Sequence, residues 1–437
     1  MGNPEGLALR KCKLVLRWSG DSLEVLKDVD VLIRNGKIER IAKADTVNIS
    51  EKDYEIVNCS RYVVLPGLVN AHTHSPMVLL RGYCDDLELH EWLSRMWEVE
   101  RHLDARIIEL ASELAIMEML STGTTAFVDM YFYPEVTAEV AKRMGIRAAL
   151  GPPLIEVLYS ADKCLREIEE FHRKYSNDEL IIPIVNVHSI YTCSLDTVKA
   201  AAELAKKLNT NLHIHVSETR KEVFEAKRKY GKFPVEILHD LGVLNEHAHL
   251  VHLGWVTSRE IELIRFSGAT VTHCPVSNMK LATAGFFPFF EMIASGINVT
   301  IGTDGAASNN CLDMFREMKT AVLLQRNNYW DTRIKALHVL RAATLCGYRL
   351  LKLKGGNIEE GYLADLVLID AESPYLQPLR MDNVLSNIVY AATGRDVAMT
   401  IVNGKIVYDR ERDYAKWKER CQYISSELNK FIEKFIK

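Results

Sequence analysis

Short apolar runs alternate with amphipathic stretches across the middle of this 437-residue chain, and no other feature constrains its fold as strongly. Each run is expected to be a buried strand, because a strand covered on both faces is apolar throughout. The runs cover residues 68–73, 124–130, 147–150, 181–187, 212–215, 249–253, 270–273 and 299–302. Helices are expected between most of them, at residues 105–120, 136–144, 162–175, 195–208, 259–265 and 287–294. Eight strands alternating with helices over roughly 240 residues predict an α/β fold, a (β/α)8 barrel of the TIM type.

A doubly wound open sheet is the competing architecture for such a pattern. That fold places a glycine-rich dinucleotide-binding loop after an early strand. No such loop is found in this sequence, so the closed barrel is preferred.

The two ends of the chain carry similar hairpin signals. Asn35-Gly36 and Asn403-Gly404 each separate two strand-like runs. Asn-Gly favours a two-residue hairpin, since both central residues need positive φ. With a further strand at residues 364–370, the ends are predicted to fold together as one small β module. The predicted division assigns residues 1–66 and 357–412 to this module, residues 67–356 to the barrel and residues 413–437 to a C-terminal amphipathic helix that packs on the body or on a partner subunit.

Histidines collect where the predicted strands end. Six of the 14 histidines lie at such positions: His72, His74, His188, His215, His252 and His273. Asp304 likewise follows the eighth strand. His72 and His74 are two apart in a strand, so both point to one side. The C-terminal rim is where barrel enzymes build their active sites. His213 and His249 are expected to face away from the site, and the remaining histidines to be surface or packing residues.

Imidazoles and a carboxylate on one rim suit a divalent ion, either Zn²⁺ or Fe²⁺, with one position left for water. Such an ion activates that water near neutral pH. Asp304 would bind the ion and accept the proton of the water. Glu218, three residues beyond His215, would protonate a ring nitrogen without binding metal, and His252 would contact the water or serve as a further ligand. A buried polar network without catalysis is the alternative, and is not favoured because such clusters are costly to bury.

Four segments carry distinctive motifs: PGLVNAHTHSPMVLLRG (residues 66–82), HIHVSET (213–219), SNMKLA (277–282) and GTDGAASNN (302–310). Together they resemble the amidohydrolase superfamily, and more narrowly the methylthioadenosine/S-adenosylhomocysteine deaminases and their chlorotriazine-hydrolase relatives. The resemblance implies a composite β-sandwich beside the barrel and a homo-oligomer. It also implies metal ligands His72, His74, His215 and Asp304, a catalytic Glu218, and His252 beside the hydrolytic water. Substrate contacts are implied for His188 and for a glutamate best matched by Glu100, with Glu98 as the alternative.

One position departs from the family pattern. Adenosyl-substrate members place an arginine after a GIRA-type segment, where this chain has Pro152. The apolar loop at residues 155–160 is therefore expected to favour a neutral 5′ substituent over an amino-acid tail. Arg81 is the basic residue that could replace the missing arginine, and an equally good interpretation makes it a structural charge.

The expected function is thus metal-dependent hydrolytic deamination of the adenine ring of methylthioadenosine, S-adenosylhomocysteine or 5′-deoxyadenosine. The alternative enzyme is an aminohydrolase or chlorohydrolase acting on a free purine, pyrimidine or triazine ring. A non-catalytic barrel scaffold belongs to another class of protein, and is not favoured because every implied ligand and Glu218 are retained.

Composition narrows the partners and the compartment. Lys and Arg number 54 against 58 Asp and Glu, so nucleic acid and anionic membranes are not expected as partners. No apolar run approaches the roughly 18–20 residues of a transmembrane span, and the first residues lack a signal-peptide pattern. Nine cysteines without a CxxC pair fit reduced thiols. A soluble, cytoplasmic enzyme is expected.

Overall fold

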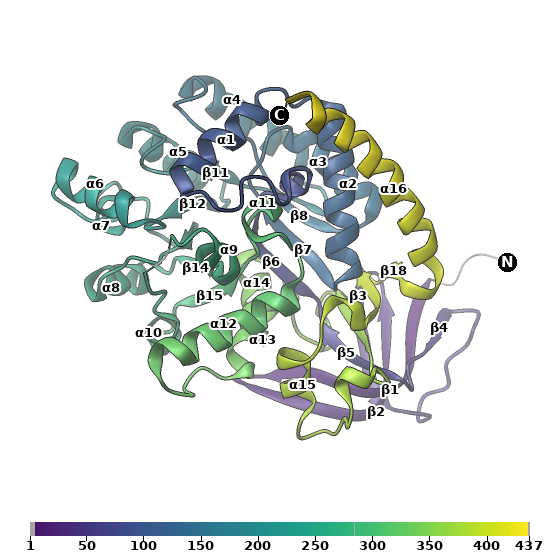
Figure 1. The fold of residues 1–437 in the computed structure, drawn as a ribbon. Coiled ribbons are helices and arrows are strands. Elements are labelled where there is room, and N and C mark those ends of the chain that lie inside the picture. The colour runs from purple at the N-terminus through teal and green to yellow at the C-terminus, as the bar shows by residue number, and fades with distance from the viewer. Residues whose placement is uncertain (1–4, 284, 436–437) are drawn as a thin grey trace.

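A (β/α)8 barrel occupies the middle of the chain, as the alternating pattern predicts (Figure 1). The computed structural model describes residues 5–283 and 285–435. The barrel strands are β6 (Leu68–Thr73), β7 (Thr124–Asp129), β8 (Arg147–Leu150), β9 (Pro153–Leu154), β10 (Ile181–Pro183), β11 (Val185–Val187), β12 (Leu212–Val216), β13 (Ala248–His252), β14 (Thr270–His273) and β15 (Asn298–Ile301). The third barrel position is shared by β8 and β9 and the fourth by β10 and β11. Accordingly, β8 pairs with β10 while β9 pairs with β11.

Helices cover the outside of the barrel (Figure 1). Six agree with the prediction to within about two residues: α2 (Ala105–Ser121), α3 (Pro134–Met144), α4 (Ala161–Tyr175), α5 (Leu195–Lys207), α8 (Ser258–Ser267) and α10 (Phe289–Ala294). Further helices were not predicted: α1 (Leu89–Glu100), α6 (Arg220–Tyr230), α7 (Pro234–Asp240), α9 (Pro275–Lys280), α11 (Ala306–Asn309), α12 (Met314–Tyr329), α13 (Ala336–Ala343), α14 (Leu345–Leu350) and α15 (Val384–Tyr390). The missed α6 buries only Glu222, Val223 and Ala226, so its apolar stripe is too short to give a clear periodicity.

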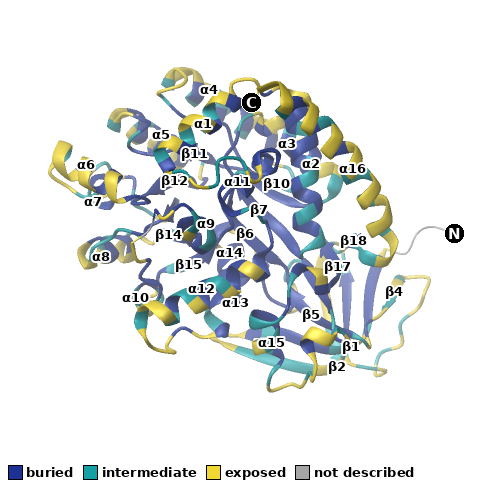
Figure 2. Cartoon of the chain, viewed as in Figure 1, coloured by how far each residue is buried: buried dark blue, intermediate teal, exposed yellow. Residues whose placement is uncertain are grey.

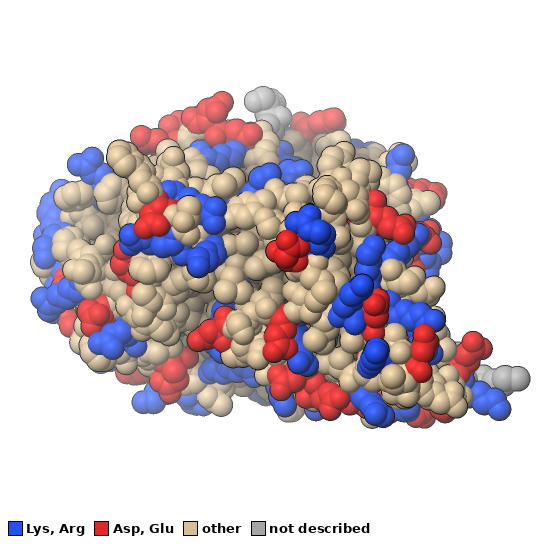
Figure 3. All heavy atoms as spheres, turned by 90° about the horizontal axis from the view of Figure 1, so that it is seen from below, with Lys and Arg blue, Asp and Glu red and all other residues tan. Residues whose placement is uncertain are grey.

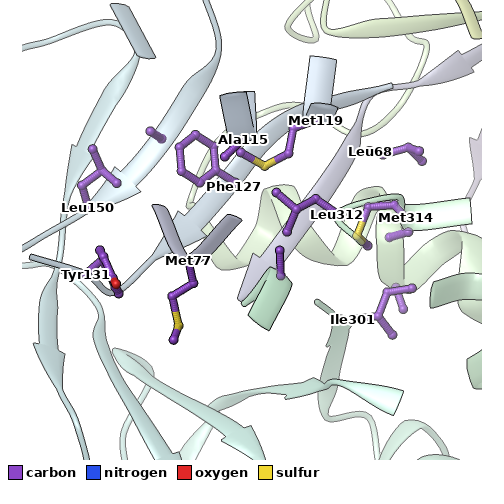
Figure 4. Close-up of a cluster of buried hydrophobic side chains, with 14 of the residues drawn as sticks. Leu68, Met77, Ala115, Met119, Phe127, Tyr131, Leu150, Ile301, Leu312 and Met314 are labelled. Atoms are coloured by element: carbon purple, nitrogen blue, oxygen red, sulfur yellow. The ribbon is translucent and has the colours of Figure 1, made fainter. Parts of the chain in front are cut away.

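The core lies between the strands and the inner faces of these helices. Figure 2 shows the strands as buried and the outer helix faces as exposed. Figure 4 shows Phe127 of β7 facing Ala115 and Met119 of α2, a contact of fully buried side chains. This packing holds the strand ends, and with them the site, on a rigid support.

The two chain ends form one β module, as their hairpin signals predict. Its strands are β1 (Gly6–Ser19), β2 (Ser22–Arg34), β3 (Lys37–Lys43), β4 (Tyr54–Asn58), β5 (Tyr62–Pro66), β16 (Leu366–Asp370), β17 (Val397–Val402) and β18 (Lys405–Asp409). They are hydrogen-bonded in the order β18-β17-β16-β5-β1-β2-β3, and β4 pairs with β1. Asn35, Gly36, Asn403 and Gly404 all have positive φ. The two turns touch, since a Cβ on Gly404 would lie 3.2 Å from the Cα of Gly36.

The last helix, α16 (Arg410–Phe435), lies along α2 (Figure 1). Ile424, Leu428 and Phe431 form its buried stripe. The apolar spacing of the C-terminal segment is therefore explained within one chain, since this stripe packs on the barrel body.

Charges of both signs are mixed over the molecular surface seen in Figure 3. This agrees with the net charge of −4. Among the described residues, no helix is both long enough and apolar enough to cross a membrane.

One buried ion pair joins the barrel to the β module. Arg147, at the start of β8, donates through Nε to Asp365 Oδ2 at 2.6 Å and through Nη2 to Oδ1 at 3.2 Å. Asp365 also accepts from Tyr348 Oη and from the backbone N–H of Asn403, each at 2.6 Å. Both charged side chains are almost completely buried. Removing the negative charge would leave the guanidinium buried without its counter-ion.

We therefore expect Asp365→Asn to lower the free energy of unfolding by about 3–5 kcal/mol, the usual effect of breaking a buried pair. Urea unfolding followed by circular dichroism measures it. Asp382→Asn, which removes an exposed pair with Arg380, is the matched control and should cost about 1 kcal/mol or less. Equal losses in the two variants would contradict a special role for the buried pair.

Candidate active site

Strand ends on one rim bring four imidazoles and a carboxylate together. His72 lies in β6 and His74 directly follows it, His215 lies in β12 and His252 in β13, and Asp304 follows β15. The ligand-type atoms of His72, His74 and His215 lie within 4.8 Å of one another, and so do those of His72, His252 and Asp304. The rim therefore holds a compact cluster of groups that could bind a metal ion.

Barrel closure places Asp304 in this cluster. Its backbone N–H donates to the carbonyl of His72 at 2.9 Å. Gly302 permits this approach, because a Cβ there would lie 2.6 Å from the backbone nitrogen of His72. Asp304 Oδ1 then lies 3.5 Å from His72 Nε2 and 3.3 Å from His74 Nε2. Ser277 Oγ donates to the other carboxylate oxygen at 2.6 Å.

In His74 and His215, a hydrogen bond donated by Nδ1 aims the other ring nitrogen, Nε2, at the cluster. His74 Nδ1 lies 2.6 Å from the carbonyl of Met130, and His215 Nδ1 lies 2.7 Å from the carbonyl of His188. A carbonyl only accepts, so these Nδ1 atoms carry the hydrogen and each Nε2 presents a lone pair. Such outer contacts are typical of histidines that bind metals.

His72 meets the requirements of a metal ligand. Its Nε2 is buried and has no hydrogen-bond partner, which is costly unless something else binds it. Burial lowers the pKa of His72 to about 4, so the ring is neutral and able to bind a cation. Three imidazole nitrogens and one carboxylate oxygen form a donor set that fits Zn²⁺ or Fe²⁺.

Two histidines take positions that the strand pattern alone does not give. His213 was expected to face away from the site and does not line the pocket, but its Nε2 lies 2.9 Å from His72 Nδ1. The strand period does turn it from the pocket, but its ring reaches across the barrel interior to the ring of the candidate ligand His72. His273 ends β14 as predicted but does not line the pocket, because its ring stacks on Phe287 with centroids 4.3 Å apart.

Glu218 leaves β12 through a sharp turn that another glutamate holds. Ser217 has a φ of +52°. Glu222 accepts the N–H of Ser217 at 3.0 Å and that of Glu218 at 2.8 Å. Sequence analysis missed Glu222, although Thr219 and Glu222 form the Thr-x-x-Glu pattern of a helix start, with Thr219 Oγ1 accepting the N–H of Glu222. Burial, reinforced by the charge of Asp304, raises the pKa of Glu218 to about 8.

His252 lies between the cluster and Glu218. Its Nε2 is 3.7 Å from Glu218 Oε1, and its Nδ1 is 2.9 Å from Asn278 Oδ1. Its ring stacks on that of His215 with centroids 5.3 Å apart. A small molecule that reached the cluster would therefore meet Glu218 and His252 on the same side.

A pocket opens onto these groups. Its polar lining comprises His74, Glu100, His188, His215, Glu218, His252, Asp304 and Ser308. Helix α1 supplies much of the apolar wall through Leu89, Trp92, Leu93, Met96 and Trp97. None of the described residues that line the pocket is Lys or Arg.

Of the two glutamates proposed for substrate contact, Glu100 is the one at the pocket. It is buried, and its Oε1 accepts from Tyr131 Oη at 2.6 Å. Glu98 is about half exposed and pairs with Arg95. Burial raises the pKa of Glu100 to about 7, against the hydrogen bond from Tyr131, which lowers it.

His188 also reaches the pocket, immediately after β11. Its Nδ1 lies 3.0 Å from Thr192 Oγ1, and its ring is edge-on to Tyr191. Its backbone carbonyl is the group that orients His215. One residue thus lines the pocket and holds a candidate ligand.

The loop after β9 needs a further correction. The whole apolar loop was expected to face a substrate, but only Ile155 lines the pocket. Val157, Leu158 and Tyr159 are exposed, because the chain turns outward where the Leu158 N–H donates to the carbonyl of Ile155.

Arg81 does not replace the missing arginine. It donates to Glu118 and, at 2.7 Å, to the carbonyl of Asn310, and it does not line the pocket. Its interpretation as a structural charge is therefore the one that fits.

Comparison with known proteins extends this picture. The sequence profile of the amidohydrolase family matches residues 63–407. A 5-methylthioadenosine/S-adenosylhomocysteine deaminase of Archaeoglobus fulgidus is 40% identical over 402 residues, which cover 88% of this chain and 93% of the relative. A 5′-deoxyadenosine deaminase of Methanopyrus kandleri is 42% identical over 392 residues, covering 88% and 90%. The crystal structure of an adenosine deaminase from Xanthomonas campestris with bound zinc superposes with a TM-score of 0.90 at 34% identity, covering 98% of this chain and all of that one.

The raised pKa of Glu100 predicts a pH-dependent stability. In the folded protein its carboxyl stays protonated up to about pH 7, whereas in the unfolded chain it ionises from about pH 4.5. The stability of the wild type should therefore fall as the pH rises from about 4.5 to about 7, whereas Glu100→Gln cannot ionise and should not show this loss. In metal-free protein, the variant should be more stable than wild type by about 3 kcal/mol at about pH 8.5 and equal to it at about pH 4.

Urea unfolding of both proteins at the two pH values measures this difference. Glu98→Gln, an exposed neighbour on the same helix, is the control and should show no such pH dependence. A stability difference between wild type and Glu100→Gln that does not change with pH would contradict a protonated Glu100.

Proposed function

The chain belongs to the amidohydrolase family, and we propose that it is a metal-dependent hydrolytic deaminase that releases ammonia from the adenine ring of a 5′-modified adenosine. One observation carries the proposal: the ligand atoms of His72, His74 and His215 cluster together, and Asp304 Oδ1 lies 3.5 Å from His72 Nε2 and 3.3 Å from His74 Nε2. Glu218 lines the same largely apolar pocket. The substrates named for the relatives of Archaeoglobus fulgidus and Methanopyrus kandleri support this substrate class.

His72, His74, His215 and Asp304 would hold one divalent ion, with Zn²⁺ preferred and Fe²⁺ as the alternative. The ion would supply Lewis acidity and a water activated at neutral pH. The neutral His72 ring and its unpartnered Nε2 support this assignment. The zinc in the related adenosine deaminase of Xanthomonas campestris supports the choice of metal.

Glu218 is the proton donor in this proposal. Its raised pKa keeps the carboxyl protonated near neutral pH, so it can deliver a proton to a ring nitrogen while the neighbouring carbon is attacked. Glu222 would hold it in place through the two backbone N–H groups of the turn. Asp304 would accept the proton released by the attacking water, and His252 would orient that water with its Nε2.

Glu100 and His188 would bind polar groups of the substrate. Both line the pocket and both are held by hydrogen bonds, Glu100 by Tyr131 and His188 by Thr192. The apolar wall from α1 would cover the remaining surface of the nucleoside and exclude water from the reacting ring.

Two variants test this division of roles. Glu218→Gln keeps the shape of the side chain but cannot donate an acidic proton, so turnover should fall about 10²–10⁴-fold while the protein keeps its metal. His72→Ala should lose both metal and turnover. Ammonia release and elemental analysis measure the two properties. Near-full activity of Glu218→Gln, or a full metal content in His72→Ala, would contradict the assignments.

Substrate preference tests the 5′ side of the pocket. A carboxylate tail is best held by a guanidinium, and the described lining has neither Arg nor Lys. We expect kcat/KM for methylthioadenosine and 5′-deoxyadenosine to exceed that for S-adenosylhomocysteine by about tenfold, the effect of roughly one unmade hydrogen bond to a charge. The three nucleosides are compared at one ionic strength. A clear preference for S-adenosylhomocysteine would refute this view of the pocket.

A further inference from the structure

The three candidate histidine ligands differ in what holds their Nδ1 atoms. His74 and His215 contact backbone carbonyls, which cannot change their hydrogen-bonding role. His72 contacts the ring of His213 instead, at 2.9 Å. An imidazole nitrogen can donate or accept, so this contact alone does not fix which nitrogen of His72 carries the hydrogen.

Asn186 on β11 resolves the ambiguity. Its Nδ2 lies 3.0 Å from the carbonyl of Asp129 and 2.8 Å from that of Gly151. Because both carbonyls accept, the amide nitrogen must face them, and Oδ1 faces the other way. Oδ1 lies 2.8 Å from His213 Nδ1.

The donor and the acceptor of each hydrogen bond between Asn186, His213 and His72 can then be assigned in turn. His213 Nδ1 donates to Asn186 Oδ1, because an amide oxygen only accepts. A neutral imidazole has a single N–H, so His213 Nε2 is an acceptor. His72 Nδ1 must be the donor to it, which leaves a lone pair on His72 Nε2, 3.5 Å from Asp304 Oδ1.

We propose that His213 and Asn186 are positioning residues that hold His72 in its metal-binding tautomer and thereby set the affinity of the metal site. This inference rests on the proposed function. All three side chains are fully buried, so no water is available to take over a broken link. Without the link, His72 could carry its hydrogen on Nε2, where it would block a metal ion.

A second contact fixes the orientation of the His213 ring. The ring of His249 stacks on it with centroids 4.7 Å apart and an angle of 18° between the planes. His249 is held in turn by Thr272, whose Oγ1 lies 2.6 Å from its Nε2. The hydrogen-bonded chain from Asn186 through His213 to His72, called the relay below, thus crosses the barrel interior. It runs from the carbonyls of Asp129 and Gly151 to the candidate ligand on β6.

Two substitutions of nearly equal size separate hydrogen bonding from packing. In His213→Gln, the amide oxygen can accept from His72 and the amide nitrogen can donate to Asn186. His213→Met fills similar space but does neither. The affinity of full-length protein for Zn²⁺ is measured by competition with a chromogenic chelator, and folding of the metal-free proteins by circular dichroism.

We expect His213→Met to bind Zn²⁺ about 10- to 100-fold more weakly than wild type, and His213→Gln to differ from wild type by less than about tenfold. Equal affinities in all three proteins would overturn the relay while leaving the metal site intact. Losses of the same size in both variants would also overturn it, because hydrogen bonding would not be the cause. A wild type that binds no Zn²⁺ would overturn the proposed metal site, and this inference with it.

Wild-type protein provides a measurement that does not depend on the folding of a variant. Neutron diffraction from metal-free crystals locates the exchangeable hydrogens of the buried rings. Deuterium on Nδ1 of both His72 and His213 would support the relay. Deuterium on Nε2 of His213 would overturn it.

Discussion

Closure of the barrel between β6 and β15 is the contact on which the whole site depends. Asp304 donates its backbone N–H to the carbonyl of His72 at 2.9 Å, and Gly302 leaves the room that this approach needs. Next to this contact, Asn70 of β6 and Thr303, which follows β15, form two hydrogen bonds with each other. Candidate metal ligands from the ends of the first and last barrel strands are therefore held next to each other by the strands themselves. A tightly bound cation requires ligands that are held rigidly in this way.

Burying so many polar rings inside a barrel is stable only if each is neutral and each hydrogen has an acceptor. Burial lowers the pKa of His72, His213 and His249, so none of these rings carries a charge. Backbone carbonyls or side-chain oxygens take up the hydrogens of His74, His213 and His249. His72 Nε2 is the exception within this group, since it has no partner. This unpartnered atom lies at the candidate metal site, 3.5 Å from Asp304 Oδ1.

Much of this arrangement could be predicted from the sequence, because it depends on local period. Strand spacing puts His72 and His74 on one side, and parallel strands bring their ends to one rim. Three features escaped prediction, because each depends on a contact or a turn that the strand period does not encode. His213 was expected to face away, yet it contacts His72 from a different strand. Glu222 holds the Glu218 turn by accepting two backbone N–H groups, whereas its Thr-x-x-Glu pattern indicates only the start of a helix. Residues 157–159 are apolar but exposed, since a turn directs them outward.

The groups proposed for catalysis and the residues that would select the substrate lie on different structural elements. The groups proposed for catalysis come from strand ends or from a turn held by Glu222, where packing and hydrogen bonds leave little freedom. The wall that would meet the substrate comes largely from α1, which lies outside the barrel ladder. Side chains on such a helix can change without moving a strand. A chain of this kind can therefore keep one set of proposed catalytic groups, while the size and charge of the molecule that fits the pocket depend on a few residues of α1 and the loop after β9. The departure at Pro152 from the pattern of the resembling family is consistent with that separation, since it leaves the candidate metal ligands in place.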